Sequence, residues 1–351
     1  MFKRLFRRYI QSNISVINMK TRTWLIALAT SAIIAVASIV GIFIYIKSSE
    51  IRTLKIASTS SLNDTGLLDA FEDAFEPKYG IDLHFLSTGS GIAMQNGKRG
   101  IVDLILVHDP KAESSFIQDG YGVCRKIIAY NFFAIVGPQT DPAKIQNSTP
   151  IQAMTRILEA GRNGIALWVS RADLSGTHSK EKSLWTTAGF NWSDIRNEVG
   201  WYKEVGQQMG QTLLMTYNMK IGGVPAAYTL TDMGTYLMFT KEGRINLPII
   251  VGQGQELLNV YSVIAVSNTK YANVSFENAI KFIKYSISDE GQQLISNYGK
   301  EAYGQSLFFG AVNLLKNNTD PTLAEWIRNY AFLNGSECPL EYRDGHPELY
   351  S

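Results

Sequence analysis

The longest apolar stretch of the chain is residues 24–46, which carry no charged side chain. As a helix at 1.5 Å per residue this stretch would be about 34 Å long, enough to cross the hydrocarbon core of a membrane. The residues before it include lysines and arginines but no acidic residue, and such a flank stays in the cytoplasm. The pattern therefore predicts a cytoplasmic segment at 1–23, an uncleaved transmembrane anchor at 24–46 and an extracytoplasmic remainder.

A cleaved signal peptide is the competing interpretation of this stretch. Ala35, Val36 and Ala37 resemble the small-residue site at which such peptides are cut. The apolar run continues for nine residues past Ala37, which favours the anchor. A start at Met19 instead of Met1 would give the same anchor a shorter basic flank. Residues 47–53 then form a linker that spans at most about 25 Å.

From residue 54 onward, short apolar strands alternate with amphipathic helices. We expect strands at 54–58, 81–86, 102–107, 131–137, 165–169, 227–230, 247–251 and 259–266. Helices are expected between most of these strands, for example at 67–75, 92–97 and 151–160. This alternation is typical of an α/β fold with a parallel sheet.

The chain also shows where it divides into two lobes. A polar run follows Pro138 and extends to Pro150, as at a domain boundary. The expected strand at 259–266 resembles the one at 131–137, as if the chain crossed to a second lobe and returned. We therefore predict that residues 54–136 and 259–351 form lobe I, and that residues 137–258 form lobe II.

Three expected strand-to-helix junctions share one composition of hydroxyls and glycines. They are Ser58–Ser61, Ser87–Gly91 and Arg171–Thr177, and the last also contains an arginine. Unpaired backbone N–H groups and the positive end of the helix dipole make such helix starts suitable for an anion. In an open α/β sheet the carboxyl ends of the strands are where ligands bind. The three junctions predict an oxyanion site in a cleft between the lobes.

Ordinary helix capping is the simpler explanation of any one junction. Capping does not account for the arginine or for the paired glycines. Carboxylates near the site would select the protonation state of the ligand, because a carboxylate accepts hydrogen bonds and repels a dianion. Asp109 and Asp173 are the candidates, and each also suits a cap or turn position.

Composition and charge exclude several other functions. Residues 1–46 hold six of the 33 basic residues and no acidic one, so the remainder has 27 basic and 31 acidic residues, a net charge of −4. This balance gives no support for nucleic-acid binding. Neither the four histidines nor the two cysteines show metal-ligand spacing. Because the sequence also lacks a hydrolase elbow and a dinucleotide fingerprint, we expect no enzyme, no cofactor and no metal. A disulfide between Cys124 and Cys338 remains open.

Five motifs stand out along the chain: ASTSSLNDTG at 57–66, LSTGSGIA at 86–93, VDLILVHDPKAE at 102–113, VSRADLSGTHSKEKSLW at 169–185 and YTLTDMGTY at 228–236. Together they resemble the tungstate-binding receptors of tungstate ABC transporters. The likeness covers about residues 54–310, and the part from Asn313 onward does not match. It implies a type II periplasmic-binding-protein fold, with two α/β lobes that are joined by two hinge strands and close on the ligand.

The resemblance also implies a function and a set of binding residues. It implies an extracytoplasmic receptor that binds tungstate and delivers it to an ABC permease with its ATPase. The implied ligand-binding residues are Ser58, Thr59, Ser60, Thr88, Ser90, Arg171, Ser175, Gly176 and Thr177. A receptor for molybdate or phosphate is the alternative, and so is a tethered oxyanion sensor.

Overall fold

The computed structural model describes Trp24, residues 30–40 and residues 52–351 of the chain. Contacts divide the chain into one unit up to Arg52 and a second, compact unit from Thr53 to Ser351. In the first unit, residues 30–40 are helical, and the side chains of Ile33, Ile34 and Ile39 are exposed. The second unit holds all the motifs considered above.

The predicted anchor at 24–46 falls only partly on described residues, because 25–29 and 41–46 lie outside them. The predicted cytoplasmic segment 1–23 also lies outside, as does most of the linker 47–53. Over the stretches that the structure does describe, no helix combines the length and the apolar character needed to cross a membrane.

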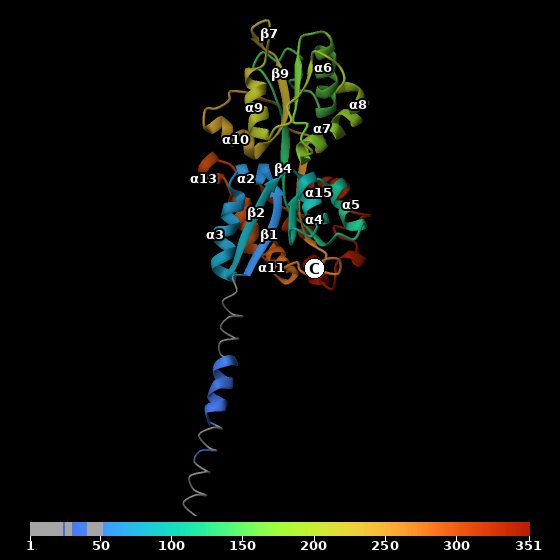
Figure 1. The fold of residues 1–351 in the computed structure, drawn as a ribbon. Coiled ribbons are helices and arrows are strands. Elements are labelled where there is room, and N and C mark those ends of the chain that lie inside the picture. The colour runs from blue at the N-terminus through green and yellow to red at the C-terminus, as the bar shows by residue number, and fades with distance from the viewer. Residues whose placement is uncertain (1–23, 25–29, 41–51) are drawn as a thin grey trace, which may run out of the picture. The chain divides into compact units, whose positions relative to one another are not determined.

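Strands and helices alternate along the second unit, as the sequence predicts (Figure 1). Its strands in the described residues are β1 (Arg52–Thr59), β2 (Ile81–Thr88), β3 (Leu104–Val107), β4 (Gly122–Val136), β5 (Leu167–Ser170), β6 (Tyr202–Glu204), β7 (Lys220–Ile221), β8 (Val224–Pro225), β9 (Ala227–Asp232), β10 (Ile249–Val251), β11 (Leu258–Val266) and β12 (Phe309–Gly310).

The helices begin at positions with recognisable caps, such as Asp109, Thr149 and Ser175. They are α2 (Ser60–Asp64), α3 (Leu67–Tyr79), α4 (Ser90–Lys98), α5 (Pro110–Gln118), α6 (Pro150–Arg162), α7 (Gly176–Thr187), α8 (Trp192–Ile195), α9 (Met209–Asn218), α10 (Met233–Lys241), α11 (Phe276–Ile287), α12 (Asp289–Asn297), α13 (Lys300–Tyr303), α14 (Val312–Asn317) and α15 (Pro321–Ala331), with 3₁₀ helices η1 (Gln255–Leu257), η2 (Leu340–Tyr342) and η3 (Pro347–Tyr350).

The main sheet is mixed rather than purely parallel. Its strand order is β2-β1-β3-β11-β4-β9-β5-β6. β1 pairs with β3 in parallel, and β5 pairs in parallel with both β6 and β9. Between these groups, β11 is antiparallel to β3 and β4, and β4 is antiparallel to β9. Two parallel groups are thus joined through the antiparallel strands β4 and β11.

Strand β4 is longer than the sequence pattern predicts. It begins at Gly122, nine residues before the expected strand, and runs from the elements around β1 to those around β9 (Figure 1). The early part contains Arg125 and Lys126, whose charges interrupt the apolar pattern. Arg125 is fully buried against Glu113 at 2.7 Å, and Lys126 pairs with Glu337 at 2.8 Å. Partners distant in sequence therefore neutralise the charges within the strand.

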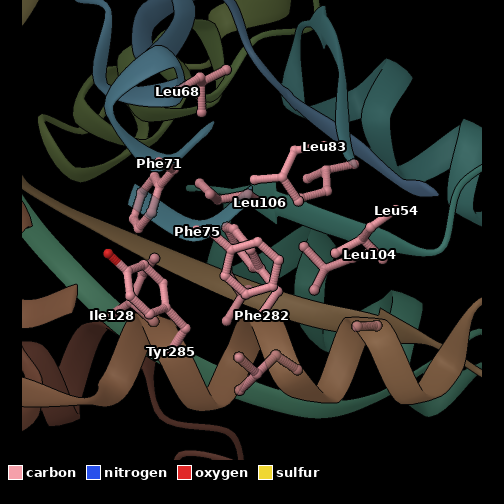
Figure 2. Close-up of a cluster of buried hydrophobic side chains, with 14 of the residues drawn as sticks. Leu54, Leu68, Phe71, Phe75, Leu83, Leu104, Leu106, Ile128, Phe282 and Tyr285 are labelled. Atoms are coloured by element: carbon pink, nitrogen blue, oxygen red, sulfur yellow. The ribbon is translucent and has the colours of Figure 1, made fainter. Parts of the chain in front are cut away.

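The hydrophobic core forms separate clusters. The cluster in Figure 2 takes its buried members from residues 54–129 and 261–349. There, Phe75 of α3 packs against Phe282 and Tyr285 of α11, with ring centroids 5.4 and 5.5 Å apart. Another cluster, around Trp168 and Trp185, takes its buried members from residues 133–257.

The C-terminal part of the chain, from Asn313 onward, lies outside the motifs quoted above and contacts β4 through Glu337 and Tyr350. Glu337 accepts hydrogen bonds from the Ile127 N–H at 2.6 Å and from Lys126 Nζ at 2.8 Å. The Tyr350 hydroxyl donates to the Arg125 carbonyl at 2.9 Å. Cys124 and Cys338 are both buried and have free thiols in this structure.

Replacing Phe75 by alanine tests the packing of α3 on α11. Phe75 is fully buried, so we expect Phe75→Ala to lower the free energy of unfolding by about 3 to 5 kcal/mol. Phe309→Ala is the matched control, because this ring is 41% exposed, and it should cost far less. Urea unfolding followed by circular dichroism measures both. Equal losses would contradict this account of the core.

Candidate anion-binding site

Arg171 follows β5 directly, and the loop after it leads into α7. Ala172 and Leu174 in this loop have positive φ angles of 50° and 58°, a strained conformation for residues other than glycine. Ser175 then caps α7, with its Oγ accepting a hydrogen bond from the His178 N–H at 3.2 Å. The loop therefore holds a fixed shape that the surrounding structure has to enforce.

A buried carboxylate in α7 fixes the end of β5. Glu181 accepts hydrogen bonds from Trp168 Nε1 at 2.8 Å and from Ser170 Oγ at 2.7 Å, both in β5. It also accepts from the Tyr202 hydroxyl at 2.6 Å and from Trp185 Nε1 at 3.2 Å. The donors Trp168 and Ser170 tie β5 to Glu181 in α7, so the loop between these two elements is held at both ends.

The Arg171 guanidinium is almost completely buried, at 3% exposure. Its Nη2 lies 2.5 Å and its Nε lies 3.1 Å from Asp173 Oδ2, so the charge is partly neutralised by its own loop. The guanidinium also faces two hydroxyls: Nη1 is 3.5 Å from Thr177 Oγ1, and Nη2, which pairs with Asp173, is 3.5 Å from Ser60 Oγ. Arg171 therefore links the third predicted junction to the first.

The second junction, Ser87–Gly91, contacts the third, Arg171–Thr177, through Gly89 and Gly91. The Gly91 N–H donates to the Leu174 carbonyl at 3.2 Å. A Cβ on Gly89 would lie 3.4 Å from Ser175 Cα, and one on Gly91 would lie 3.0 Å from the Leu174 carbonyl oxygen. A side chain at Gly91 would require the Leu174 carbonyl to move by a few tenths of an ångström, whereas one at Gly89 would make an ordinary van der Waals contact.

The structure thus brings together all three junctions that the sequence singles out. Ser58, Thr59, Ser60, Ser90, Ser175, Gly176 and Thr177 are buried beside or near the loop of Arg171. Thr88 is half-buried, and its hydroxyl donates to the Ser58 carbonyl at 3.4 Å. That these residues bind a ligand remains a prediction.

Two of the buried hydroxyls have no hydrogen-bond partner within the described part of the chain. They are Ser58 Oγ at the end of β1 and Ser90 Oγ at the start of α4. A buried polar group without a partner costs about 1 to 3 kcal/mol, and such groups are rare in folded proteins. A bound ligand that accepts hydrogen bonds would satisfy both hydroxyls.

Sequence reasoning missed a fourth junction, at the end of β9. Strand β9 runs parallel to β5 and ends at Asp232, so Asp232 and Arg171 lie at neighbouring strand ends. Asp232 Oδ1 caps α10 by accepting from the Thr235 N–H at 2.8 Å. Its Oδ2 is buried without a partner among the described residues, while the Thr235 side chain hydrogen-bonds to the same carboxyl group. The signal was present, because Thr231–Thr235 repeats the hydroxyl and glycine composition of the other junctions.

Two carboxyl groups near Arg171 have unusual protonation behaviour. Burial raises the pKa of Asp232, while Arg171 opposes this shift. Burial, and then the charge of Asp232, raises the pKa of Asp64 in α2 to about 6, again with Arg171 opposing. The group around Arg171 therefore contains carboxyls that hold a proton more readily than usual.

The other residues singled out from the sequence lie in different settings. Asp109 caps α5 by accepting from the Ala112 N–H at 3.2 Å, as the capping interpretation expects. His178 is buried, which lowers its pKa to about 4, and neither ring nitrogen has a partner among the residues described. His108 Nδ1 lies 2.7 Å from Asn259 Oδ1 in β11, and its ring fills the space beside Gly176.

This arrangement is suited to binding a small tetrahedral anion. One guanidinium supplies positive charge, several buried hydroxyls come from different junctions, and helices α4 and α7 start at the loops concerned. Among the residues with described positions, no group of His, Cys, Asp and Glu is arranged to hold a metal ion.

Comparisons with known proteins agree with this chemistry. Residues 47–290 match the PBP superfamily domain. The tungstate-binding protein TupA of Peptoclostridium acidaminophilum is 39% identical over 256 residues, covering 72% of this chain and 84% of the relative. The structure of the tungstate ABC transporter from Geobacter sulfurreducens shares 39% identity, with 70% of this chain and 98% of that one covered and a TM-score of 0.61.

A second solved structure, the tungstate-binding protein TupA of Desulfovibrio alaskensis G20, shares 34% identity. It covers 74% of this chain and 98% of its own, with a TM-score of 0.62. The predicted α/β fold of the periplasmic-binding-protein type is thereby confirmed. Substrate-binding proteins of ABC transporters are extracytoplasmic and bind their ligands without converting them. The chain belongs to the PBP superfamily and, within it, to the family of substrate-binding proteins of tungstate ABC transporters.

Proposed function

We propose that this protein captures tungstate between two lobes and delivers it to the permease of an ABC importer, whose ATPase drives transport. The observation that carries the proposal is the buried Arg171 guanidinium, which faces the hydroxyls of Thr177 and Ser60. The first and second junctions also contain the buried hydroxyls of Ser58 and Ser90, which have no partner among the described residues. The family relationship supports tungstate as the ligand, since the two solved structures named above are described as a tungstate ABC transporter and a tungstate-binding protein.

The proposed ligand cage consists of the residues implied by the sequence. They are Ser58, Thr59, Ser60, Thr88, Ser90, Arg171, Ser175, Gly176 and Thr177. A hydrogen bond to a charged group contributes about 1.5 to 3 kcal/mol, and nanomolar affinity needs about 12 kcal/mol. Six or seven such bonds would give about 9 to 20 kcal/mol before the cost of association. These donors can therefore supply binding energy of the required order without a metal or a cofactor.

The proposed closure uses β4 and β11 as hinge strands between lobe I (54–136 and 259–351) and lobe II (137–258). Support comes from a buried hydrogen-bond network on these strands. Asn259 Nδ2 donates to Asn131 Oδ1 at 2.8 Å and to the Tyr261 hydroxyl at 2.8 Å. Asn259 also contacts His108, and His108 lies against Gly176. A movement of the hinge strands would therefore shift the start of α7.

A phosphate receptor is the second candidate, and Asp232 is the observation that favours it. A buried carboxylate beside the site would accept a hydrogen bond from hydrogen phosphate, whereas tungstate is a fully deprotonated dianion at neutral pH. Molybdate has nearly the same size and charge as tungstate, so only direct competition separates these two ligands. A tethered oxyanion sensor would bind the same anion without a permease.

Arg171→Ala tests the centre of the site. We expect the affinity for tungstate to fall at least about 100-fold, because two or more hydrogen bonds to a charged group are lost at about 1.5 to 3 kcal/mol each. Calorimetric titration with tungstate, molybdate, sulfate and phosphate measures this. The matched control is Arg196→Ala, since Arg196 is an exposed arginine that pairs with Glu204. An unchanged tungstate affinity in Arg171→Ala would remove Arg171 from the site.

We also propose that residues 24–46 anchor the receptor in the membrane, with residues 1–23 in the cytoplasm. The uncharged run and its basic flank support this orientation. The full-length chain should then stay in membranes washed with alkaline carbonate, with its first residue at Met1 or Met19. A released chain that begins after Ala37 would show instead that the segment is a cleaved signal peptide.

A further inference from the structure

Asp232 has a carboxyl oxygen that the fold does not use. The side chain is 1% exposed, and Oδ1 caps α10 while Oδ2 has no hydrogen-bond partner in the part of the chain that the structure describes. The Thr235 side chain, one helical turn away, hydrogen-bonds to the same carboxyl group and lowers its pKa. The buried Oδ2 without a partner at the start of α10 indicates that a ligand completes this site.

The position of Asp232 places it at the candidate anion site. Strands β5 and β9 are parallel neighbours, with Leu167 opposite Ala227 and Trp168 opposite Tyr228. Continuing this register brings Arg171 level with Thr231, next to Asp232. The start of α10 also contacts lobe I, because a Cβ on Gly234 would lie 2.5 Å from Thr65 Cγ2. Asp232 is thus close both to Arg171 and to the C-terminal end of α2.

The charges that act on Asp232 come from two other elements. Arg171, in the loop after β5, stabilises the ionised carboxylate, and Asp64 in α2 repels it. The register neighbour in β4 is Phe133, which is apolar. Burial is the largest influence and raises the pKa of Asp232. An ionised Asp232 beside a bound dianion would add repulsion that the single Arg171 charge, already shared with Asp173, cannot offset.

We propose that Asp232 is a ligand-binding residue that holds one proton between its Oδ2 and the bound oxyanion. With tungstate, the carboxyl supplies the proton and donates an O–H hydrogen bond to a tungstate oxygen. With a hydrogen oxyanion, the ligand supplies the proton and the carboxylate accepts it. In both cases the complex contains the same single proton, and no covalent bond forms or breaks.

On the basis of the proposed tungstate binding, this shared proton makes the tungstate affinity depend on pH. Above the pKa of Asp232 in the free receptor, each tungstate bound takes one proton from solution. The affinity then weakens as pH rises, by up to about tenfold per pH unit, because binding and protonation are linked. At lower pH, where Asp232 is already protonated in the free receptor, the affinity no longer depends on pH through this group.

Calorimetric titration of tungstate in buffers of different ionisation enthalpy counts the protons taken up. For the wild-type receptor titrated at pH values from 6 to 8.5, we expect the uptake to rise towards one proton per tungstate as Asp232 becomes ionised in the free receptor. Asp232→Asn should reduce this value to near zero while it keeps binding at pH 6, because the amide can both cap α10 and donate to the anion. Asp320→Asn is the matched control, since Asp320 caps α15 through the Leu323 N–H at 3.0 Å, and should leave the proton count unchanged.

The other possible outcomes contradict either the proposal for Asp232 or the proposed tungstate binding. Tungstate binding without proton uptake in the wild type between pH 6 and 8.5 would overturn the inference on Asp232 alone and would need no variant. Proton uptake that persists in Asp232→Asn would also overturn it, and would assign the proton to another group such as Asp64. An absence of any tungstate binding by the wild type would overturn the proposed function itself.

Discussion

The burial of the Arg171 guanidinium is the constraint on which the site depends. A buried charge is costly unless it is paired and hydrogen-bonded, and here the pairing comes from Asp173, two residues along the same loop. This local pairing lets Arg171 remain in the interior while Nη1 and Nη2 face Thr177 and Ser60. The loop needs the strained conformations of Ala172 and Leu174, and Glu181 holds its two ends in place.

The loop around Arg171 is also connected to the centre of the main sheet. The His108 ring lies against Gly176 on one side and forms a hydrogen bond with Asn259 on the other. Asn259 in β11 is paired with Asn131 in β4, so the start of α7 is linked to the two strands that join the parallel groups. Burial lowers the pKa of His108 to about 4, so this ring is neutral near pH 7 and adds no charge to the site.

Much of this organisation could be predicted from the sequence, because the signals are local. The strand-to-helix junctions, the cap at Asp109 and the strand at 259–266 depend on short patterns, and the structure contains each of them. The beginning of β4 could not be predicted, since Arg125 and Lys126 are neutralised by Glu113 and Glu337 from other parts of the chain. Glu181 and Asp232 were missed for a related reason: their importance depends on which side chains surround them after folding.

The central claim is that the junctions around Arg171 enclose a tungstate ion. Anomalous scattering from tungsten in crystals grown with tungstate locates the ion directly, without any assumption about the ligand contacts. The account predicts one strong peak within hydrogen-bonding distance of Arg171, Ser58 and Ser90. A peak elsewhere on the protein, or no ordered tungsten under conditions where the ion binds in solution, would contradict it.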